Sequence, residues 1–210
     1  MIVVGVDGCR AGWAVAFANL DEILEVRVLP TFADVLALRA AAIAIDMPIG
    51  LAPAGPRACD IEARRRLGPR RSSVFPAPVR PMLAADTYQA ALAIGGLSKQ
   101  AYHLLPKIRE VDALMTARRQ RTIVEAHPEL CFARLIGHPC HEPKRTAAGR
   151  AERQMVVNLT IERPPTGAAW DDVLDACALV ETARRLVSGD VERLGDGSRD
   201  QRGLRCEIVL

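Results

Sequence analysis

The chain has 210 residues, half of them hydrophobic and a quarter charged, with a formal net charge of +3. This length suits one domain over residues 1–210, and so small a net charge does not by itself indicate a polyanionic partner. The six cysteines form no C-x-x-C pair, no apolar run reaches the roughly 18 residues of a transmembrane helix, and the N-terminus lacks the basic segment of a signal peptide. These features exclude a disulfide-rich secreted scaffold and a membrane protein, and they predict a cytoplasmic protein with reduced thiols.

Residues 2–46 predict a strand-rich beginning. Apolar or alternating runs at 2–6, 13–18 and 23–29, separated by turn residues, indicate three strands in a meander. A helix over 32–41 is expected next, with Thr31 as its N-cap. The apolar residues 42–45 then predict a fourth strand.

Residues 47–120 differ in character from the segment before them. They begin with a stretch rich in proline and glycine and continue with helical patterns, which predicts a largely helical insertion within the domain. After it we expect a short strand that ends at Glu125 and helices over 129–137 and 144–161. The chain should finish with a long amphipathic helix over 169–189 and a final strand over 203–210.

Carboxylates follow the predicted strands in a repeated manner. Asp7, Asp46 and Glu125 each come where an apolar run stops, and residues at strand tips project toward the crevice where ligands bind. Asp172 and Asp175 lie three apart near the start of the last long helix, so they share one face of it. Each acid alone also suits a turn or a helix cap.

Several carboxylates at one point require a cation. Two of them at about 4 Å repel by about 4 kcal/mol at an effective dielectric constant near 20. Mg²⁺ or Mn²⁺, which prefer oxygen ligands, would remove that repulsion and assist cleavage of a phosphodiester. The spacing therefore predicts a magnesium or manganese site formed by Asp7, Asp46, Glu125, Asp172 and Asp175.

Other side chains are candidates for contacts to a phosphate or for proton transfer. Arg71, Ser72 and Ser73 lie in a proline-bounded segment where guanidinium and hydroxyl groups are able to hold an anion, although a solvated loop explains them equally well. Lys107 and Lys144 would reach the phosphate, or lie at the surface as most lysines do. His127 would transfer protons near the metal, or bond to the backbone of its loop.

The segments "GVDGCRAGW", "IDMPIGL", "RRSSVFPAP", "LSKQAYHLLPKI", "VEAHPEL" and "DDVLDA" occur in this order. With them the chain resembles the DUF429 family, predicted nucleases of ribonuclease H-like fold. The resemblance implies an α/β architecture: a mixed five-stranded sheet that begins with an antiparallel meander, flanked by helices. It also implies that Asp7 is the metal ligand on the first strand and that Asp172 and Asp175 are the ligands on the last helix. The middle ligand is either Asp46 or Glu125.

Two functions follow from these observations. The first is a metal-dependent nuclease or phosphodiesterase whose partner is nucleic acid or a small phosphorylated substrate. The second is a non-catalytic module that uses the same fold to bind a nucleotide or a protein, expected as a homodimer. A titration with Mn²⁺ followed by cleavage assays would separate them, because only the enzyme turns a substrate over.

Overall fold

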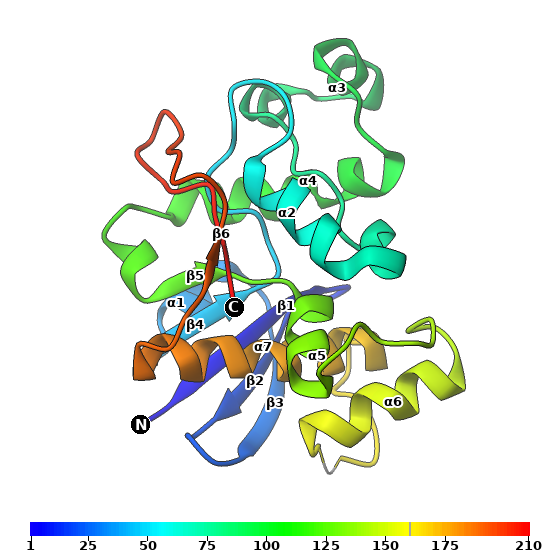
Figure 1. Ribbon diagram of the computed structural model, residues 1–210. Coiled ribbons are helices and arrows are strands. Elements are labelled where there is room, and N and C mark those ends of the chain that lie inside the picture. The colour runs from blue at the N-terminus through cyan, green and yellow to red at the C-terminus, as the bar shows by residue number, and fades with distance from the viewer. Residues whose placement is uncertain (160) are drawn as a thin grey trace.

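A mixed five-stranded sheet lies at the centre of the computed structural model, which describes residues 1–159 and 161–210 (Figure 1). The strand order is β3-β2-β1-β4-β5. β1 pairs antiparallel with β2, and β2 with β3, whereas β4 is parallel to both β1 and β5. The architecture implied by the family resemblance is therefore confirmed. The strands are β1 (Val3–Cys9), β2 (Gly12–Ala18), β3 (Ile23–Leu29), β4 (Ala42–Ile45) and β5 (Ile123–Glu125).

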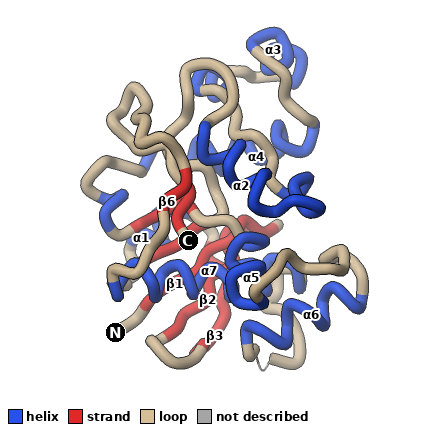
Figure 2. The backbone as a smooth tube through the Cα atoms, in the orientation of Figure 1, coloured by secondary structure: helices blue, strands red, loops and turns tan. Residues whose placement is uncertain are grey.

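Six helical segments lie between β4 and β5 and form what we call the helical lobe, residues 47–121. Figure 2 shows α2, α3 and α4 above the strands, joined to them by long loops. The segments of the lobe are α2 (Ala58–Leu67), η1 (Gly68–Ser73), η2 (Arg80–Ala84), α3 (Tyr88–Ile94), α4 (Lys99–Leu114) and η3 (Arg119–Arg121).

The remaining elements flank the sheet: α1 (Phe32–Leu36), α5 (Pro128–Ile136), α6 (Ala147–Val157), α7 (Trp170–Ser188) and the strands β6 (Arg193–Leu194) and β7 (Ile208–Val209). β6 and β7 pair with each other in a separate two-stranded sheet, so the expected final strand is short and does not join the main sheet. Over the described ranges, no helix combines the length and the apolar character needed to cross a membrane.

Two helices are shorter than the sequence pattern predicts. α1 has five residues, because the chain beyond it turns back to the sheet, where the Ala41 N–H donates to the carbonyl of Ile2 at 2.8 Å. α6 begins only after its N-cap Thr146, whose hydroxyl accepts from the Gly149 N–H, and it ends at Asn158 in a left-handed conformation. Lys144 therefore lies in the loop before α6, and Thr160, within the expected helix, lies outside the described residues.

Both faces of the sheet are covered because its strands alternate between two cores. Val3 and Ala16 face α7 on one side, whereas Val4, Val6 and Val15 face the lobe on the other. Gly5 permits the closest approach: a Cβ built there would lie 2.0 Å from the carbonyl oxygen of Ala176. Helix α7 can therefore lie directly against β1, which fixes the acids of α7 relative to those of the sheet.

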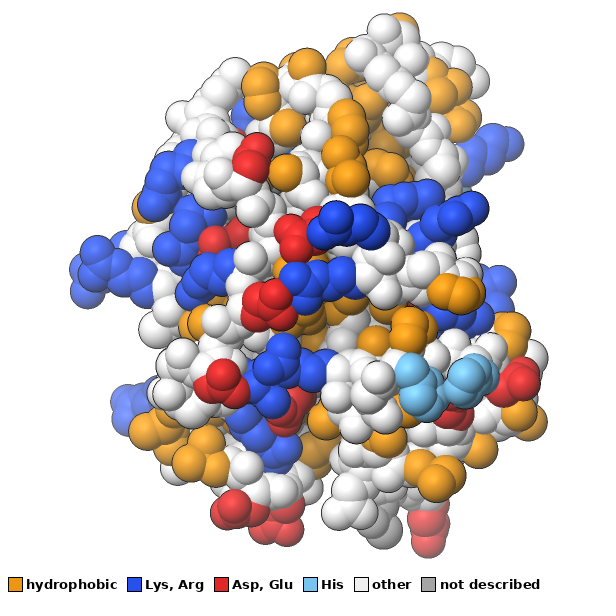
Figure 3. Space-filling model, in the orientation of Figure 1, with side chains coloured by type: hydrophobic (Ala, Val, Ile, Leu, Met, Phe, Trp, Pro, Cys, Tyr) orange, Lys and Arg blue, Asp and Glu red, His pale blue; other side chains and the backbone are white. Residues whose placement is uncertain are grey.

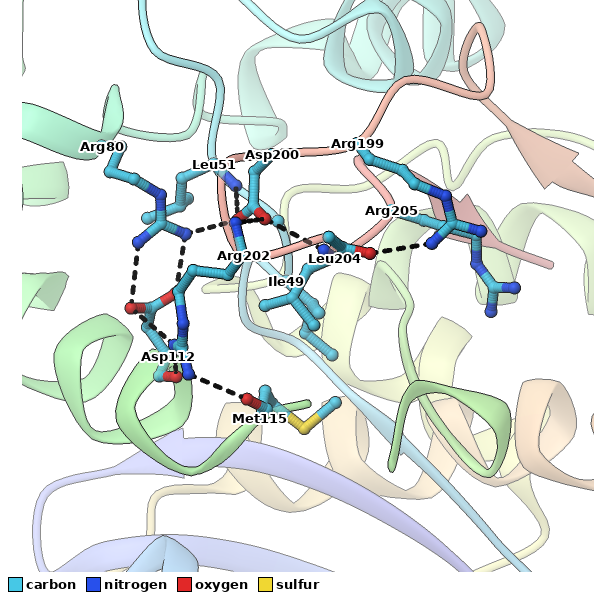
Figure 4. A network of polar contacts seen from close by, with 12 residues as sticks. Ile49, Leu51, Arg80, Asp112, Met115, Arg199, Asp200, Arg202, Leu204 and Arg205 are labelled. Carbon is cyan, nitrogen blue, oxygen red and sulfur yellow. Dashed lines mark hydrogen bonds and ion pairs between the residues drawn. The ribbon is translucent and has the colours of Figure 1, made fainter. Parts of the chain in front are cut away.

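A polar network ties the lobe to the C-terminal segment (Figure 4). Arg80 of η2 pairs with Asp112 of α4 at 2.9 Å and also with Asp200, whose side chain is fully buried. Asp200 further accepts the N–H groups of Leu51 at 3.1 Å and Leu204 at 3.0 Å. Since buried charges are stable only when they are paired, these contacts hold the lobe in a defined position over the sheet.

Candidate active site

A cavity of about 580 Å³ lies between the strand tips and the helical lobe. It brings together residues that are far apart in the sequence, and most of the predicted site residues line it. These are Asp7, Asp46, Ser72, Ser73, Glu125, His127, Lys144, Asp172 and Asp175. Arg71 and Lys107 are not part of its lining.

Asp7 and Asp46 are neighbours because β1 and β4 are parallel. Their last paired residues are Val6 and Ile45, so the two acids follow at the same edge of the sheet, where the Asp46 N–H donates to the Val6 carbonyl at 3.0 Å. Asp7 still belongs to β1, which extends to Cys9 in its pairing with β2. Strand geometry thus delivers both carboxylates to one wall of the cavity.

Asp172 and Asp175 reach the same cavity from the first turns of α7, which packs against β1. Asp172 also stabilises the helix start, since it accepts the Ala169 N–H at 2.8 Å; Ala169, and neither Asp171 nor Asp172, occupies the N-cap. The helix therefore contributes one fully buried acid, Asp175, and one that combines capping with exposure to the cavity.

Burial raises the pKa values of all four aspartates, and the charges of other acids add to the effect. Burial, followed by the charges of Asp175 and Asp46, raises the pKa of Asp7 well above its usual value. Burial raises the pKa of Asp46 and of Asp172 as well. It raises the pKa of Asp175 to about 6, although Lys144 acts in the opposite direction. This pattern is that of like charges gathered in a site of low dielectric constant.

Lys144 supplies the positive charge among these acids. Its ammonium group lies 2.8 Å from the Asp175 carboxylate, and its charge also acts on Asp7 and Asp46. Burial lowers the pKa of Lys144, but Asp175, Asp7 and Asp46 together raise it by more, so the pKa lies above its usual value and the group stays charged. The loop before α6 thus places a cation beside the carboxylates.

Glu125 differs from the other acids because its oxygens already have partners. It is buried and forms two hydrogen bonds with the Arg57 guanidinium, at 2.6 and 2.7 Å, and it accepts the Ile49 N–H at 2.6 Å. Arg57 pairs in addition with Asp60 at 2.6 Å. By contrast, the half-buried Asp46 side chain forms no hydrogen bond with any described residue. The two candidates for the middle position therefore differ, since the fold gives partners to the oxygens of Glu125.

The other predicted residues divide between the cavity and its surroundings. The ammonium group of Lys107 donates to the Gly12 carbonyl and lies 4.4 Å from the centre of the Trp13 ring, which is a structural position. Arg71 is exposed outside the cavity. His127 lies with its Nε2 3.3 Å from the Ser73 carbonyl oxygen, and within the described ranges its buried Nδ1 has no partner.

Further charged residues line the cavity beyond the predicted set, among them Arg70, Glu129 and Arg145. Glu129 is 4% exposed, and its Oε1 accepts two hydrogen bonds from Arg153, whereas its Oε2 has no hydrogen-bond partner among the described residues and lies 3.9 Å from Nε of Arg70. The run "EAHPE" contained the signal for Glu129, since its two acids flank His127, but a charge near a helix N-terminus explains it equally well.

The donor atoms suit a divalent cation of the Mg²⁺ type in their chemistry, because the four aspartates offer only carboxylate oxygens. The charges of Asp175 and Asp46 add to the burial that raises the pKa of Asp7, and a positive charge beside these carboxylates acts in the opposite direction, as Lys144 does. In the arrangement described here, however, no group of three or more His, Cys, Asp or Glu side chains among the described residues is placed to hold a metal ion. Lys144 instead provides the opposing charge.

Positive charge extends beyond the cavity. Figure 3 shows Lys and Arg side chains in a band across the middle of the molecule, with Asp and Glu side chains among them. Three lysines leave arginine as the source of nearly all the positive charge. Guanidinium groups form paired hydrogen bonds with phosphate oxygens more readily than ammonium groups do.

Comparison with known proteins identifies one family and two related structures. The family described as "Protein of unknown function (DUF429)" matches residues 5–199. No curated protein matches the sequence. Two structures of RuvC from Thermus thermophilus, one in complex with a Holliday junction substrate, each align with 12% identity and a TM-score of 0.40. They cover 90% of this chain and 97% and 98% of their own. A likeness this distant does not transfer an activity to the chain.

Proposed function

The chain belongs to the DUF429 family, and we propose that it is a divalent-metal-dependent phosphodiesterase acting on nucleic acid or a smaller phosphorylated substrate. One observation carries the proposal. Four aspartates from β1, the end of β4 and the start of α7 line a single cavity, and each has a raised pKa. Such crowding of like charges is unfavourable unless a cation or a substrate group uses it.

The aspartates have distinct roles in this proposal. Asp7, Asp46, Asp172 and Asp175 hold Mg²⁺ or Mn²⁺, while Glu125 fixes the position of the lobe through Arg57. When bound there, the cation supplies Lewis-acid stabilisation of a scissile phosphate. This assignment leaves every oxygen of Glu125 with the partners that the fold gives it.

The chain's own polar groups hold the substrate and move protons. Lys144 contacts phosphate oxygens from the loop before α6, and Arg70 and the hydroxyls of Ser72 and Ser73 contact them from the lobe. His127 keeps its Nε2 toward the Ser73 carbonyl, which leaves Nδ1 as the atom that accepts a proton. A homodimer stays a prediction.

The proposal is tested by cleavage assays with Mn²⁺ or Mg²⁺ on single-stranded, duplex, hybrid and branched substrates. Asp7→Asn should abolish cleavage without lowering the melting temperature. Asp171→Asn is the matched control, because Asp171 precedes Asp172 on α7 but does not line the cavity. Full activity in Asp7→Asn would refute the assignment. A rise in melting temperature with Mn²⁺ but no cleavage of any substrate would instead favour the non-catalytic binding module.

A further inference from the structure

Phe75 is the exposed aromatic residue of this chain. The sequence has four Phe, two Trp and two Tyr, and all are described; the other seven are buried or half-buried, whereas Phe75 is 39% exposed. Its ring also lines the cavity that holds the aspartates. An isolated exposed apolar side chain needs no explanation, but one at the wall of a charged cavity has a ligand-facing surface.

The backbone around Phe75 is held firmly although the ring is not packed in a core. Arg64 donates to the Val74 carbonyl at 2.6 Å, and the Ala77 N–H donates to Asp60 at 3.0 Å. Prolines follow at 76 and 78 and restrict the backbone on the side of the lobe. The ring is therefore presented by a pre-formed segment, so a ligand that contacts it does not have to order the loop first.

The cavity has two chemically different walls. The four aspartates and Lys144 line it from the sheet, from α7 and from the loop before α6, whereas the lobe contributes Phe75 and apolar groups of Pro76, Pro78 and Leu104 beside the polar residues of η1. The volume of about 580 Å³ lies within the range of about 300–1,000 Å³ typical of cavities for a small ligand. A ligand with one charged end and one flat apolar end fits such a pair of walls.

We propose that the cavity binds one unpaired nucleotide, with its base stacked on Phe75 and its phosphate toward Lys144 and the aspartates. This inference rests on the proposed function and adds the class of substrate to it. Bases of unpaired strands stack on aromatic side chains irrespective of sequence, because every base has a flat face. A double helix keeps its bases inside the stack, so it would have to turn a nucleotide out before one entered.

The test compares binding of a short fluorescent single strand with the same strand in a blunt duplex, titrated by anisotropy in Ca²⁺. The wild type should bind the single strand at least about tenfold more tightly. Phe75→Ala should weaken that binding about 5- to 150-fold, the usual range for loss of one stacking partner. Phe75→Trp should retain it, and Leu92→Ala, which removes an exposed side chain of α3 outside the cavity, should leave it unchanged.

Equal or tighter binding of the duplex, unchanged binding in Phe75→Ala, or no binding of any probe would overturn the inference. Competition by thymidine monophosphate identifies the source of the nucleotide: equal competition indicates a free nucleotide, and weak competition a strand. Phe75-dependent binding without cleavage would remove the proposed function and leave this inference standing. Cleavage of a duplex that is insensitive to Phe75→Ala would do the reverse.

Discussion

Asp46 follows β4 and Glu125 ends the neighbouring strand β5. Replacing each by its amide distinguishes a carboxylate with a structural role from a carboxylate that belongs to the candidate site. Glu125 is 5% exposed, and its two oxygens accept three hydrogen bonds from Arg57 and Ile49, at 2.6 to 2.7 Å. In Glu125→Gln the amide NH₂ must face one of these donors. Arg57, itself 4% exposed, would retain only Asp60 as an ionised partner.

Removal of one partner from a buried ion pair costs about 3–5 kcal/mol. For a chain of this length each kcal/mol lowers the melting temperature by about 2–4 °C, so Glu125→Gln should melt about 6–20 °C lower. Asp46→Asn should be at least as stable as the wild type, because Asp46 forms no hydrogen bond with described residues and burial, which raises its pKa, disfavours its charged form. It should nevertheless lose metal-dependent cleavage.

Urea unfolding at pH 7, followed by circular dichroism, measures the free energy of unfolding of both variants, and a cleavage assay completes the comparison. The reasoning is refuted if Glu125→Gln unfolds like the wild type. It is equally refuted if Asp46→Asn loses about 3 kcal/mol or more, since Asp46 would then have the structural role assigned to Glu125.

Three further predictions concern the acids, the lysine and the contact between α7 and β1. The pKa of Asp175, about 6, exceeds the usual 3.8, so between about pH 4 and 6 this carboxyl binds more protons in the folded state than in the unfolded state. Without divalent ions, its contribution to the free energy of unfolding should therefore fall as the pH rises through that window; a rise would contradict the shift. Without metal, Lys144→Met should lower the free energy of unfolding by about 1–3 kcal/mol. Calorimetry should nevertheless show that Lys144→Met binds Mn²⁺ more tightly than Lys144→Arg does. Weaker binding by Lys144→Met would show that Lys144 does not compete with the ion. Gly5→Ala should cost at least about 1–3 kcal/mol and reduce cleavage, because its Cβ meets Ala176; Gly96→Ala, in open space, is the control and should change neither quantity.

The strands and the acids at their ends were predictable from the sequence, because both depend on the pattern of residues within a short segment. A run such as residues 42–45 is apolar throughout, which predicts a buried strand. The acid that follows it then lies at the end of that strand, irrespective of contacts with distant parts of the chain. The family resemblance supplied the mixed five-stranded sheet and its antiparallel beginning, and the strand order came from the structure. The segment 203–210 shows where this approach ends, since a short apolar run does not specify which sheet it joins.

The choice between Asp46 and Glu125 could not be made from the sequence. It depends on Arg57, which lies 68 residues before Glu125 and has no periodic relation to it. The position of Lys144 in a loop could not be predicted for a related reason. The helical pattern of the sequence included residue 144, whereas the N-cap at Thr146 makes the helix begin later. Side-chain partners across long separations follow from packing, and local propensity carries no information about them.

The position of the helical lobe in the chain, between β4 and β5, explains why the lobe covers the cavity. β4 and β5 are parallel, and Ile45 pairs with Glu125. The C-terminal ends of both strands therefore lie at the same end of the sheet. The segment that follows Asp46 must therefore begin directly above the carboxylates. Because of this topology, an insertion at this point covers the aspartates. Arg57 then connects the beginning of the insertion to Glu125 of β5 through an ion pair. Weakening this contact should loosen the lobe before it disturbs the sheet, so Glu125→Gln should speed hydrogen exchange in α2 more than in β1.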